Sequence, residues 1–226
     1  MRQVFKCLVS LFIFFVLHKP CSAQLQAAME PRHKTVLEND YLRILDVNIL
    51  PGDTTFLHRH TLPSVVVVLS NTKVGMRAQG GQAVISKSEA GSVSYAAYDE
   101  HPVYHRVWND DTIFFHVMDI ELLRNGAKVA PQTMNDKAIL PIFSEKLVSA
   151  FKWKAGRGKS IRKKASVRPL LFICYSGSAK AIINDAAEEA ITLSAGKFWW
   201  VNTGNTIQLT GDDNTGAGFV ILELNP

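Results

Sequence analysis

Three histidines have the type and spacing that metal chemistry needs. His58 and His60 are two residues apart in the stretch PGDTTFLHRH. On a β-strand, residues two apart point to the same face, so two imidazoles there can chelate one metal ion. A third donor must come from elsewhere, and the stretch EHPVYHRVWN offers His105, with Asn109 four residues later. The histidine pair therefore indicates a candidate metal site that a second segment has to complete.

The elements that must position these residues read as short β-strands. Apolar or alternating runs recur along the first half of the chain, and turn-forming residues separate them. Eight strands with this spacing are typical of a two-sheet jelly roll. The predicted strands are 42–50, 54–60, 64–69, 73–79, 82–87, 91–97, 103–108 and 112–121.

The second half of the chain repeats this plan. The step from Gly52 to Pro63 recurs as the step from Gly158 to Pro169, and apolar strands follow in the same order. We therefore predict an all-β fold of two jelly-roll barrels in one chain, with little helix. The expected boundaries are 36–121 for the first barrel, 122–142 for a connector and 143–226 for the second barrel.

The motifs of the first half resemble those of the cupin superfamily. Gly52-x5-His58-x-His60, then Gly91, then His105-x3-Asn109 look like the two cupin signature motifs. The resemblance implies a bicupin with a degenerate second barrel. It also implies that His58, His60 and His105 bind a divalent metal inside the first barrel.

The sequence departs from the cupin pattern at the family glutamate. That position falls on Ser64 or Val65, and a serine hydroxyl is a poor ligand for a divalent cation. The second motif also lacks its Pro-x-Gly turn, for which Pro102 is a substitute. Three neutral imidazoles can still hold a metal, as in some similar cupin-related dioxygenases that use iron. Such a site keeps the full metal charge, which favours anionic or enolising ligands. The sequence leaves the metal open among iron, manganese, zinc, nickel and copper, since all accept imidazole.

The remaining histidines have simpler interpretations. We expect His33 to be solvated near the start of the mature chain, His101 to lie on a rim, and His116 to be a core residue among apolar neighbours. The alternative for His58 and His60 is a pair of hydrogen-bonded core residues in a metal-free barrel. No residue is assigned a catalytic role, although Glu100 and Tyr104 are the nearest candidates for a general base.

The second barrel is expected to bind no metal. Alignment of the two halves places Lys164, Ser166 and Gln208 where His58, His60 and His105 stand. These residues are not a usual ligand set, so the second barrel has a structural role in this interpretation.

Residues 1–23 have the layout of a cleavable signal peptide. Basic residues are followed by an apolar core too short to span a membrane, and then by the small Ala23. We expect a secreted or periplasmic protein; a lipoprotein anchored at Cys21 is the less favoured alternative. The mature chain contains no predicted transmembrane segment. Removal of Arg2, Lys6 and Lys19 lowers the net charge from +5 to about +2, which argues against nucleic-acid binding.

These observations predict an exported cupin-domain protein that binds a divalent metal through histidines. Its partner would be a small molecule, with a dioxygenase-type or other small-molecule metalloenzyme as the first interpretation. The alternative is a cupin that binds a sugar or an anion without turnover. A homo-oligomer is compatible with either.

Overall fold

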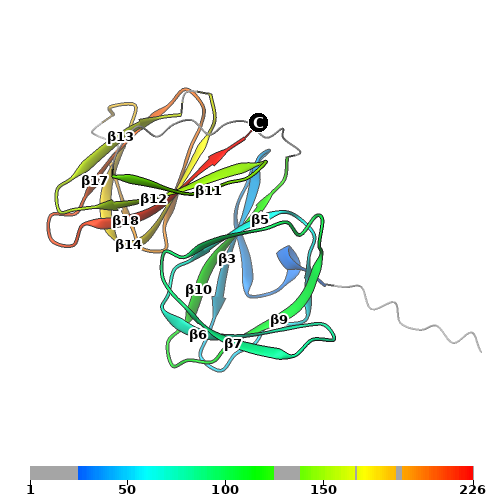
Figure 1. Cartoon of the computed structure of the whole chain (residues 1–226). Coiled ribbons are helices and arrows are strands. Elements are labelled where there is room, and N and C mark those ends of the chain that lie inside the picture. The colour runs from blue at the N-terminus through cyan, green and yellow to red at the C-terminus, as the bar shows by residue number, and fades with distance from the viewer. Residues whose placement is uncertain (1–24, 125–137, 166, 187–189, 226) are drawn as a thin grey trace, which may run out of the picture.

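The computed structural model describes residues 25–124, 138–165, 167–186 and 190–225. The signal peptide predicted for residues 1–23 lies outside this part of the chain, and so does most of the predicted connector 122–142. The described residues form strands and one short 3-10 helix, which confirms the all-β prediction. Among them, no helix has the length and apolar character that crossing a bilayer requires. Figure 1 shows two rounded β assemblies side by side, the first coloured blue to green and the second green to red.

The first barrel is built from two five-stranded sheets. One sheet has the order β1-β4-β9-β6-β7 and the other has the order β2-β3-β10-β5-β8. The elements are β1 (Leu25–Gln26), η1 (Ala27–Met29), β2 (His33–Glu38), β3 (Leu42–Ile49), β4 (His58–His60), β5 (Ser64–Val68), β6 (Thr72–Ala78), β7 (Ala83–Ser88), β8 (Val93–Ala96), β9 (Val103–Asn109) and β10 (Phe115–Leu122).

The second barrel contains the remaining strands. Its main sheet has the order β11-β12-β18-β14-β17-β13, and β15 and β16 also pair with the long strand β14. The strands are β11 (Ile139–Ser144), β12 (Val148–Ala155), β13 (Ser160–Lys164), β14 (Leu170–Ile183), β15 (Ile191–Ser194), β16 (Phe198–Val201), β17 (Thr206–Gly211) and β18 (Ala217–Leu224).

Alternating side chains give strand β3 buried apolar residues on both of its faces. Leu45 and Val47 belong to the core inside the first barrel, whereas Leu42 and Ile44 belong to a core shared with the second barrel. This alternation follows the two-residue period of a strand. Strand β3 therefore contributes to both cores.

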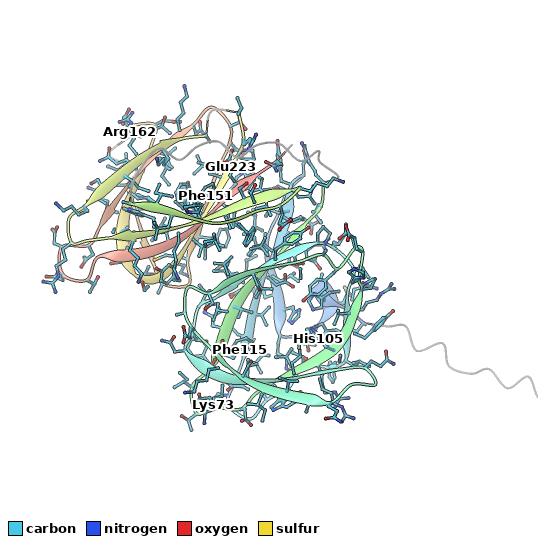
Figure 2. The ribbon with its side chains drawn as sticks, viewed as in Figure 1. Lys73, His105, Phe115, Phe151, Arg162 and Glu223 are labelled. Carbon is cyan, nitrogen blue, oxygen red and sulfur yellow. The ribbon has the colours of Figure 1, made fainter. Side chains whose placement is uncertain are left out.

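The shared core joins the two barrels. Val65 and Met118 of the first barrel pack in one apolar cluster with Leu171, Val220 and Leu222 of the second. All five side chains are at most 1% exposed. Burial on this scale is what stabilises a fixed contact between domains. Figure 2 shows the side chains that fill the region between the two ribbons.

Matching hydrogen bonds align the two barrels residue by residue. The backbone N–H of Leu122 donates to the carbonyl of Pro63, and that of Leu224 donates to the carbonyl of Pro169. With this alignment, strand β10 of the first barrel corresponds to β18 of the second. The internal repeat seen in the sequence is thus present in the strand register.

Candidate metal centre

Two neighbouring strands carry the three predicted histidines. His58 and His60 begin and end β4, and β9 runs antiparallel beside it with His105 directly opposite His58. The side chains are 1%, 5% and 7% exposed in chain order. Strand pairing therefore brings together residues that lie 47 positions apart in the chain.

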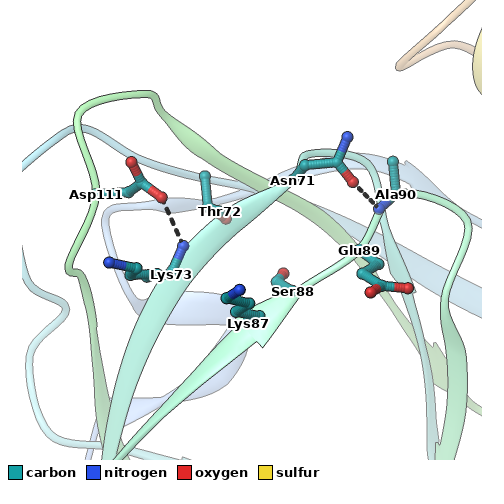
Figure 3. A pocket seen from close by; sticks show the side chains of 8 residues that line it. All are labelled: Asn71, Thr72, Lys73, Lys87, Ser88, Glu89, Ala90 and Asp111. Atoms are coloured by element: carbon teal, nitrogen blue, oxygen red, sulfur yellow. Dashed lines mark hydrogen bonds between the residues drawn. The ribbon is translucent and has the colours of Figure 1, made fainter.

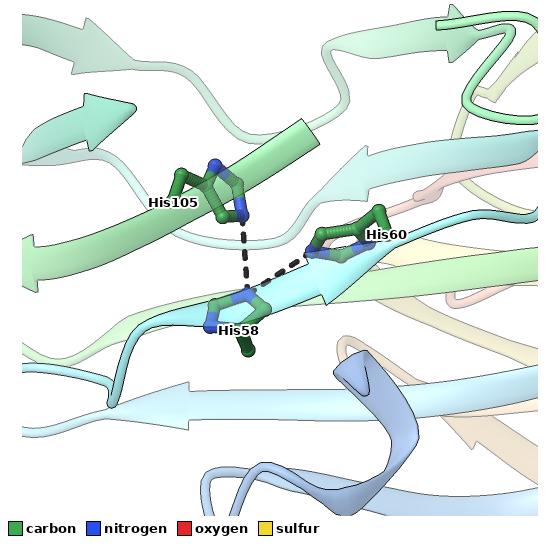
Figure 4. Close-up of side chains that lie close together, drawn as sticks. All are labelled: His58, His60 and His105. Atoms are coloured by element: carbon green, nitrogen blue, oxygen red, sulfur yellow. Dashed lines mark hydrogen bonds between the residues drawn. The ribbon is translucent and has the colours of Figure 1, made fainter. Parts of the chain in front are cut away.

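The ring nitrogens of these histidines converge on one point. Nε2 of His58 lies 3.0 Å from Nε2 of His60 and 3.1 Å from Nε2 of His105. One ligand atom from each of the three side chains lies within 4.8 Å of the others. Figure 4 shows His58 between the other two rings, with dashed lines joining the close nitrogens.

The outer nitrogen of His58 fixes the proton of that ring. Nδ1 of His58 lies 2.9 Å from the carbonyl oxygen of Phe56, which can only accept, so Nδ1 carries the hydrogen. Nε2 of His58 therefore presents a lone pair toward the Nε2 atoms of His60 and His105. This lone pair can accept a hydrogen bond from a neighbouring ring or bind a metal ion. On the outer side of His60, Nδ1 lies 3.3 Å from Oδ2 of Asp119.

The spacing of these nitrogens fits a metal ion. Metal–nitrogen bonds in imidazole sites are about 2.0–2.1 Å long, so two ligands at a right angle lie about 2.9–3.0 Å apart, and tetrahedral ligands about 3.3–3.4 Å apart. The observed separations of 3.0 and 3.1 Å are close to the right-angle value. The three residues present therefore fit a divalent transition metal.

Burial keeps His58 and His105 neutral, as metal ligands must be. Desolvation, followed by the neighbouring His60 and His58, lowers the pKa of His105 to about 3. Desolvation also lowers the pKa of His58. Protons therefore do not compete strongly for the converging nitrogens near neutral pH.

A carboxylate lies beside the candidate metal site, although it does not occupy the position of the glutamate in the cupin motif. Ser64 is fully buried, and its hydroxyl donates to the carbonyl of Leu62. The carboxylate is instead that of Asp119, which is 3% exposed on β10 and contacts the outer nitrogen of His60. A histidine held in this way by a carboxylate is a common feature of metal sites. The expectation of a full metal charge rests on the missing glutamate of the cupin motif, and the carboxyl group of Asp119 lies next to His60 instead.

A fourth histidine lies against the site, contrary to expectation. His33 is 7% exposed, and its ring centroid is 4.7 Å from that of His58 in an edge-on arrangement. Desolvation lowers its pKa to about 3, with His58 and His60 adding to the shift. The prediction of a solvated His33 is wrong because the segment before β2 folds over the barrel rather than into solvent.

Two contacts hold that N-terminal segment in place. Strand β1 runs parallel to β4, with Leu25 opposite His58. The carboxylate of Glu30, 1% exposed, accepts hydrogen bonds from the backbone N–H groups of Arg32 and Phe56. No motif in the sequence marks Glu30 or His33, because their role depends on this packing alone.

The histidines line one end of a cavity of about 210 Å³. The other polar residues that line it are His33, Ser86, Tyr98 and Asp119. Desolvation, followed by Asp119, raises the pKa of Tyr98, so its phenol keeps its proton. We call the rest of the lining the apolar wall: Val47, Ile49, Val66, Val74, Met76, Val107, Phe115 and Val117.

The architecture is similar to that of solved cupin structures. It superimposes on a cupin 2 conserved barrel domain protein from Leptotrichia buccalis with a TM-score of 0.51 and 7% sequence identity, covering 85% of this chain and 88% of that chain. The chain has the cupin fold. This outcome confirms the resemblance drawn from the histidine motifs and the prediction of two β-barrels.

Two cupin enzymes show the same likeness in fold. Salicylate 1,2-dioxygenase from Pseudaminobacter salicylatoxidans has a TM-score of 0.59 at 12% identity, covering 85% of this chain and 76% of that chain. Oxalate decarboxylase from Lactobacillus farciminis has a TM-score of 0.53 at 13% identity, covering 83% and 78% respectively. No protein-family model matches the sequence, and no curated protein is significantly similar to it.

The other singled-out residues of the first cupin barrel have local roles. Asn109 is 2% exposed, and its amide donates to the carbonyls of Ile49 and Ile113, so it organises a turn. Tyr104 lies under the guanidinium of Arg59 and does not line the cavity. His101 and Glu100 are exposed, the former as expected. His116 is half-buried rather than a full core residue, because Nε2 bonds Asp46 at 2.6 Å.

The second cupin barrel has no equivalent of the histidine cluster. Lys164 lies opposite Thr206 on β17, as His58 lies opposite His105 on β9. The strand register therefore places Thr206 at the position that corresponds to His105, whereas the sequence alignment placed Gln208 there. Ser166 lies outside the described residues.

A second hollow, shown in Figure 3, lies near the turns of the first cupin barrel. Two of its polar side chains are used locally, since Asp111 accepts from the backbone N–H of Lys73 and Asn71 accepts from that of Ala90. It contains no histidine, and its lining does not resemble that of the metal centre.

Proposed function

We propose that this protein is an exported cupin that binds one divalent metal ion through His58, His60 and His105. The observation that supports the proposal most directly is the approach of the Nε2 atom of His58 to within 3.0 and 3.1 Å of the Nε2 atoms of His60 and His105, because the hydrogen of His58 is held on Nδ1. A cation at this point would bind the lone pair of His58 together with those of the two neighbouring rings. The metal is iron, manganese, zinc, nickel or copper, all of which accept imidazole.

The proposed activity is that of a small-molecule metalloenzyme, with dioxygenase-type chemistry as the first candidate. A bound divalent metal would act as a Lewis acid on an oxygen atom of the substrate, and a redox-active metal would add chemistry with dioxygen. The protein itself orients the ligands through Phe56 and Asp119, and its apolar wall excludes water. Tyr98 offers a protonated phenol to a bound oxygen atom.

Elemental analysis of the purified protein tests the metal assignment. The wild type should contain about one metal ion per chain, and His58→Ala/His60→Ala should lose it. Lys164→Ala and Thr206→Ala are matched controls, since they change the corresponding positions of the second barrel, and they should keep the metal. If the double variant retains the same metal at the same stoichiometry, the assignment is wrong.

Measurement of oxygen uptake distinguishes a metalloenzyme from a cupin that binds its ligand without turnover. Uptake that depends on a small oxygen-bearing substrate and is lost in His58→Ala/His60→Ala would support the enzyme. Bound metal and ligand without turnover across a substrate panel would support a non-catalytic cupin.

The proposed location is secreted or periplasmic, which the composition of residues 1–23 supports. The mass of the protein purified from its own host tests this. A chain that begins at Gln24 is the expected result, and a chain that retains residues 1–23 would contradict export by this signal.

A further inference from the structure

The polar residues that line the cavity of the first barrel form one cluster, with one exception. Every polar lining residue except Ser86 is one of the three site histidines or contacts one of them. The ring of Tyr98 lies 5.0 Å from that of His60, Asp119 contacts His60, and His33 contacts His58. A molecule in the cavity therefore meets hydrogen-bonding groups at the histidine cluster and, apart from Ser86, hydrocarbon from the rest of the lining.

The cavity offers no fixed positive charge from the protein. No lysine or arginine is among the described residues that line it. The partly buried Arg43 is already bonded to Glu38 and Glu121. An anionic group of a ligand placed against the apolar wall would thus be buried without a positive partner, which is strongly unfavourable.

We propose that the ligand of this site is a small molecule with an apolar body and its oxygen atoms at one end. The inference rests on the proposed function, because the metal would lie at the end that receives those oxygens. Sugars and molecules with a charged group at both ends are excluded, since their outer polar groups would lose water and find no partner along the apolar wall.

The second barrel shows which side chains would close such a cavity. Val117 pairs with Val47 on the neighbouring strand, and the corresponding residues Phe219 and Trp153 pair in the same register. Val66 likewise lies opposite Asp119, as Phe172 lies opposite Ile221. The fold itself therefore accepts phenylalanine at the positions of Val66 and Val117.

Three six-carbon probes test the ligand class. Hexan-1-ol has one terminal oxygen, hexane-1,6-diol has one at each end, and glucose has oxygens on all sides. Binding to the full chain is measured by ligand-observed NMR, in zinc-loaded and in metal-free protein. We expect hexan-1-ol to bind about tenfold or more tightly than the diol, and glucose not to bind.

Variants show whether the probe occupies the cavity. Val66→Phe and Val117→Phe should reduce hexan-1-ol binding about tenfold or more while the metal content stays unchanged. Val167→Phe is the matched control, because Val167 is 67% exposed on the second barrel, and it should bind like the wild type.

The possible results separate the two proposals. If glucose or the diol binds as well as hexan-1-ol, or if none of the three binds, the ligand class is wrong whether or not the protein contains metal. If hexan-1-ol binds best and Val66→Phe and Val117→Phe lose it, but the protein takes up no metal, the ligand class stands and the proposed metal function fails. If both phenylalanine variants bind hexan-1-ol as the wild type does, the probe lies outside the cavity and the inference is overturned.

Discussion

The two barrels have the same strand register and opposite interiors. In the first barrel, Val47 and Val117 face a cavity with histidines at one end. In the second, Trp153 and Phe219 occupy the corresponding positions, and their rings stack with centroids 5.7 Å apart. The comparison shows that the size of a few inward side chains, rather than the path of the backbone, decides which barrel is hollow.

The polar residues of the candidate metal site have no counterparts of the same type at the corresponding positions of the second barrel. Asp119, which contacts His60, corresponds to Ile221, a fully buried residue of the second core. Lys164 and Thr206 stand opposite each other where the first barrel has His58 and His105. Among the described residues, apolar side chains fill the core of the second barrel, and through the shared core this barrel supports one sheet of the first.

The largest expected effect comes from emptying the filled barrel. Phe219→Ala should lower the free energy of unfolding by about 3–5 kcal/mol, because it leaves a cavity in a close-packed core. Val117→Ala should cost only about 1–2 kcal/mol, since Val117 already faces a cavity. Urea unfolding of the metal-free chain measures both. Equal losses would contradict the contrast between a solid and a hollow barrel.

The two barrels also differ in how they hold corresponding glutamates. Glu223 is fully buried and forms an ion pair with Arg168, whose side chain is 7% exposed, so Glu223→Gln removes one charge of a buried pair and should cost about 3 kcal/mol. Glu121→Gln should cost about 1 kcal/mol, because the 24%-exposed Arg43 keeps its bond to Glu38. Thermal and urea unfolding of the two variants compare the losses, and a larger loss for Glu121→Gln would reverse the argument.

Mild acid should destabilise the first barrel of the metal-free protein more than the second. His33 and His105 have pKa values of about 3 in the folded chain against 6.5 in the unfolded chain, so the unfolded state binds more protons below pH 6.5. Each such proton lowers stability by about 1.4 kcal/mol per pH unit, which gives about 2 kcal/mol between pH 6.5 and 5.5. The loss continues as the pH falls toward 3.

Hydrogen exchange followed barrel by barrel measures this effect. The second barrel has no histidine, because none follows His116 in the sequence, and it serves as the internal control. Loaded metal should reduce the acid sensitivity, since it blocks the ring nitrogens. Equal acid sensitivity of the two barrels would argue against the burial of neutral histidines in the first.

The smallest expected effect is on metal affinity. Asp119→Asn removes the charge beside His60 while keeping the shape of the side chain, and it should weaken metal binding about tenfold, which corresponds to about 1.4 kcal/mol. Ile221→Val, the change at the corresponding position of the second barrel, should leave the affinity unchanged. Competition with a metal-binding dye measures both, and unchanged affinity in Asp119→Asn would show that the carboxylate does not orient the site.

The barrels and the histidine cluster could be predicted because each leaves a local trace. Alternating apolar residues and turn signals predicted most strands, and the spacing of His58 and His60 placed both rings on one face. The predicted strand 54–60 was too long, since only His58–His60 form β4 and Thr54 makes an isolated bridge. The division of the chain into domains and the export signal stay predictions.

Asp119 and His33 could not be found in this way. Asp119 lies with Glu121 in the strand FHVMDIEL, and the sequence gives neither acid a characteristic spacing relative to the histidines. His33 lies before the barrel motifs, and its approach to His58 depends on how β1 pairs with β4. Both contacts arise between strands that are distant in the chain, so no local pattern records them.

The sequence by itself determined the two-barrel cupin fold and the three candidate ligands, because strand period and histidine spacing are local properties. Only the tertiary structure decided which groups surround those ligands: Asp119 beside His60, His33 over His58, and valines where the other barrel has aromatic rings. The physical reason is that the charge and volume of a buried site depend on side chains from many strands, and their meeting is fixed by strand register and packing rather than by order along the chain.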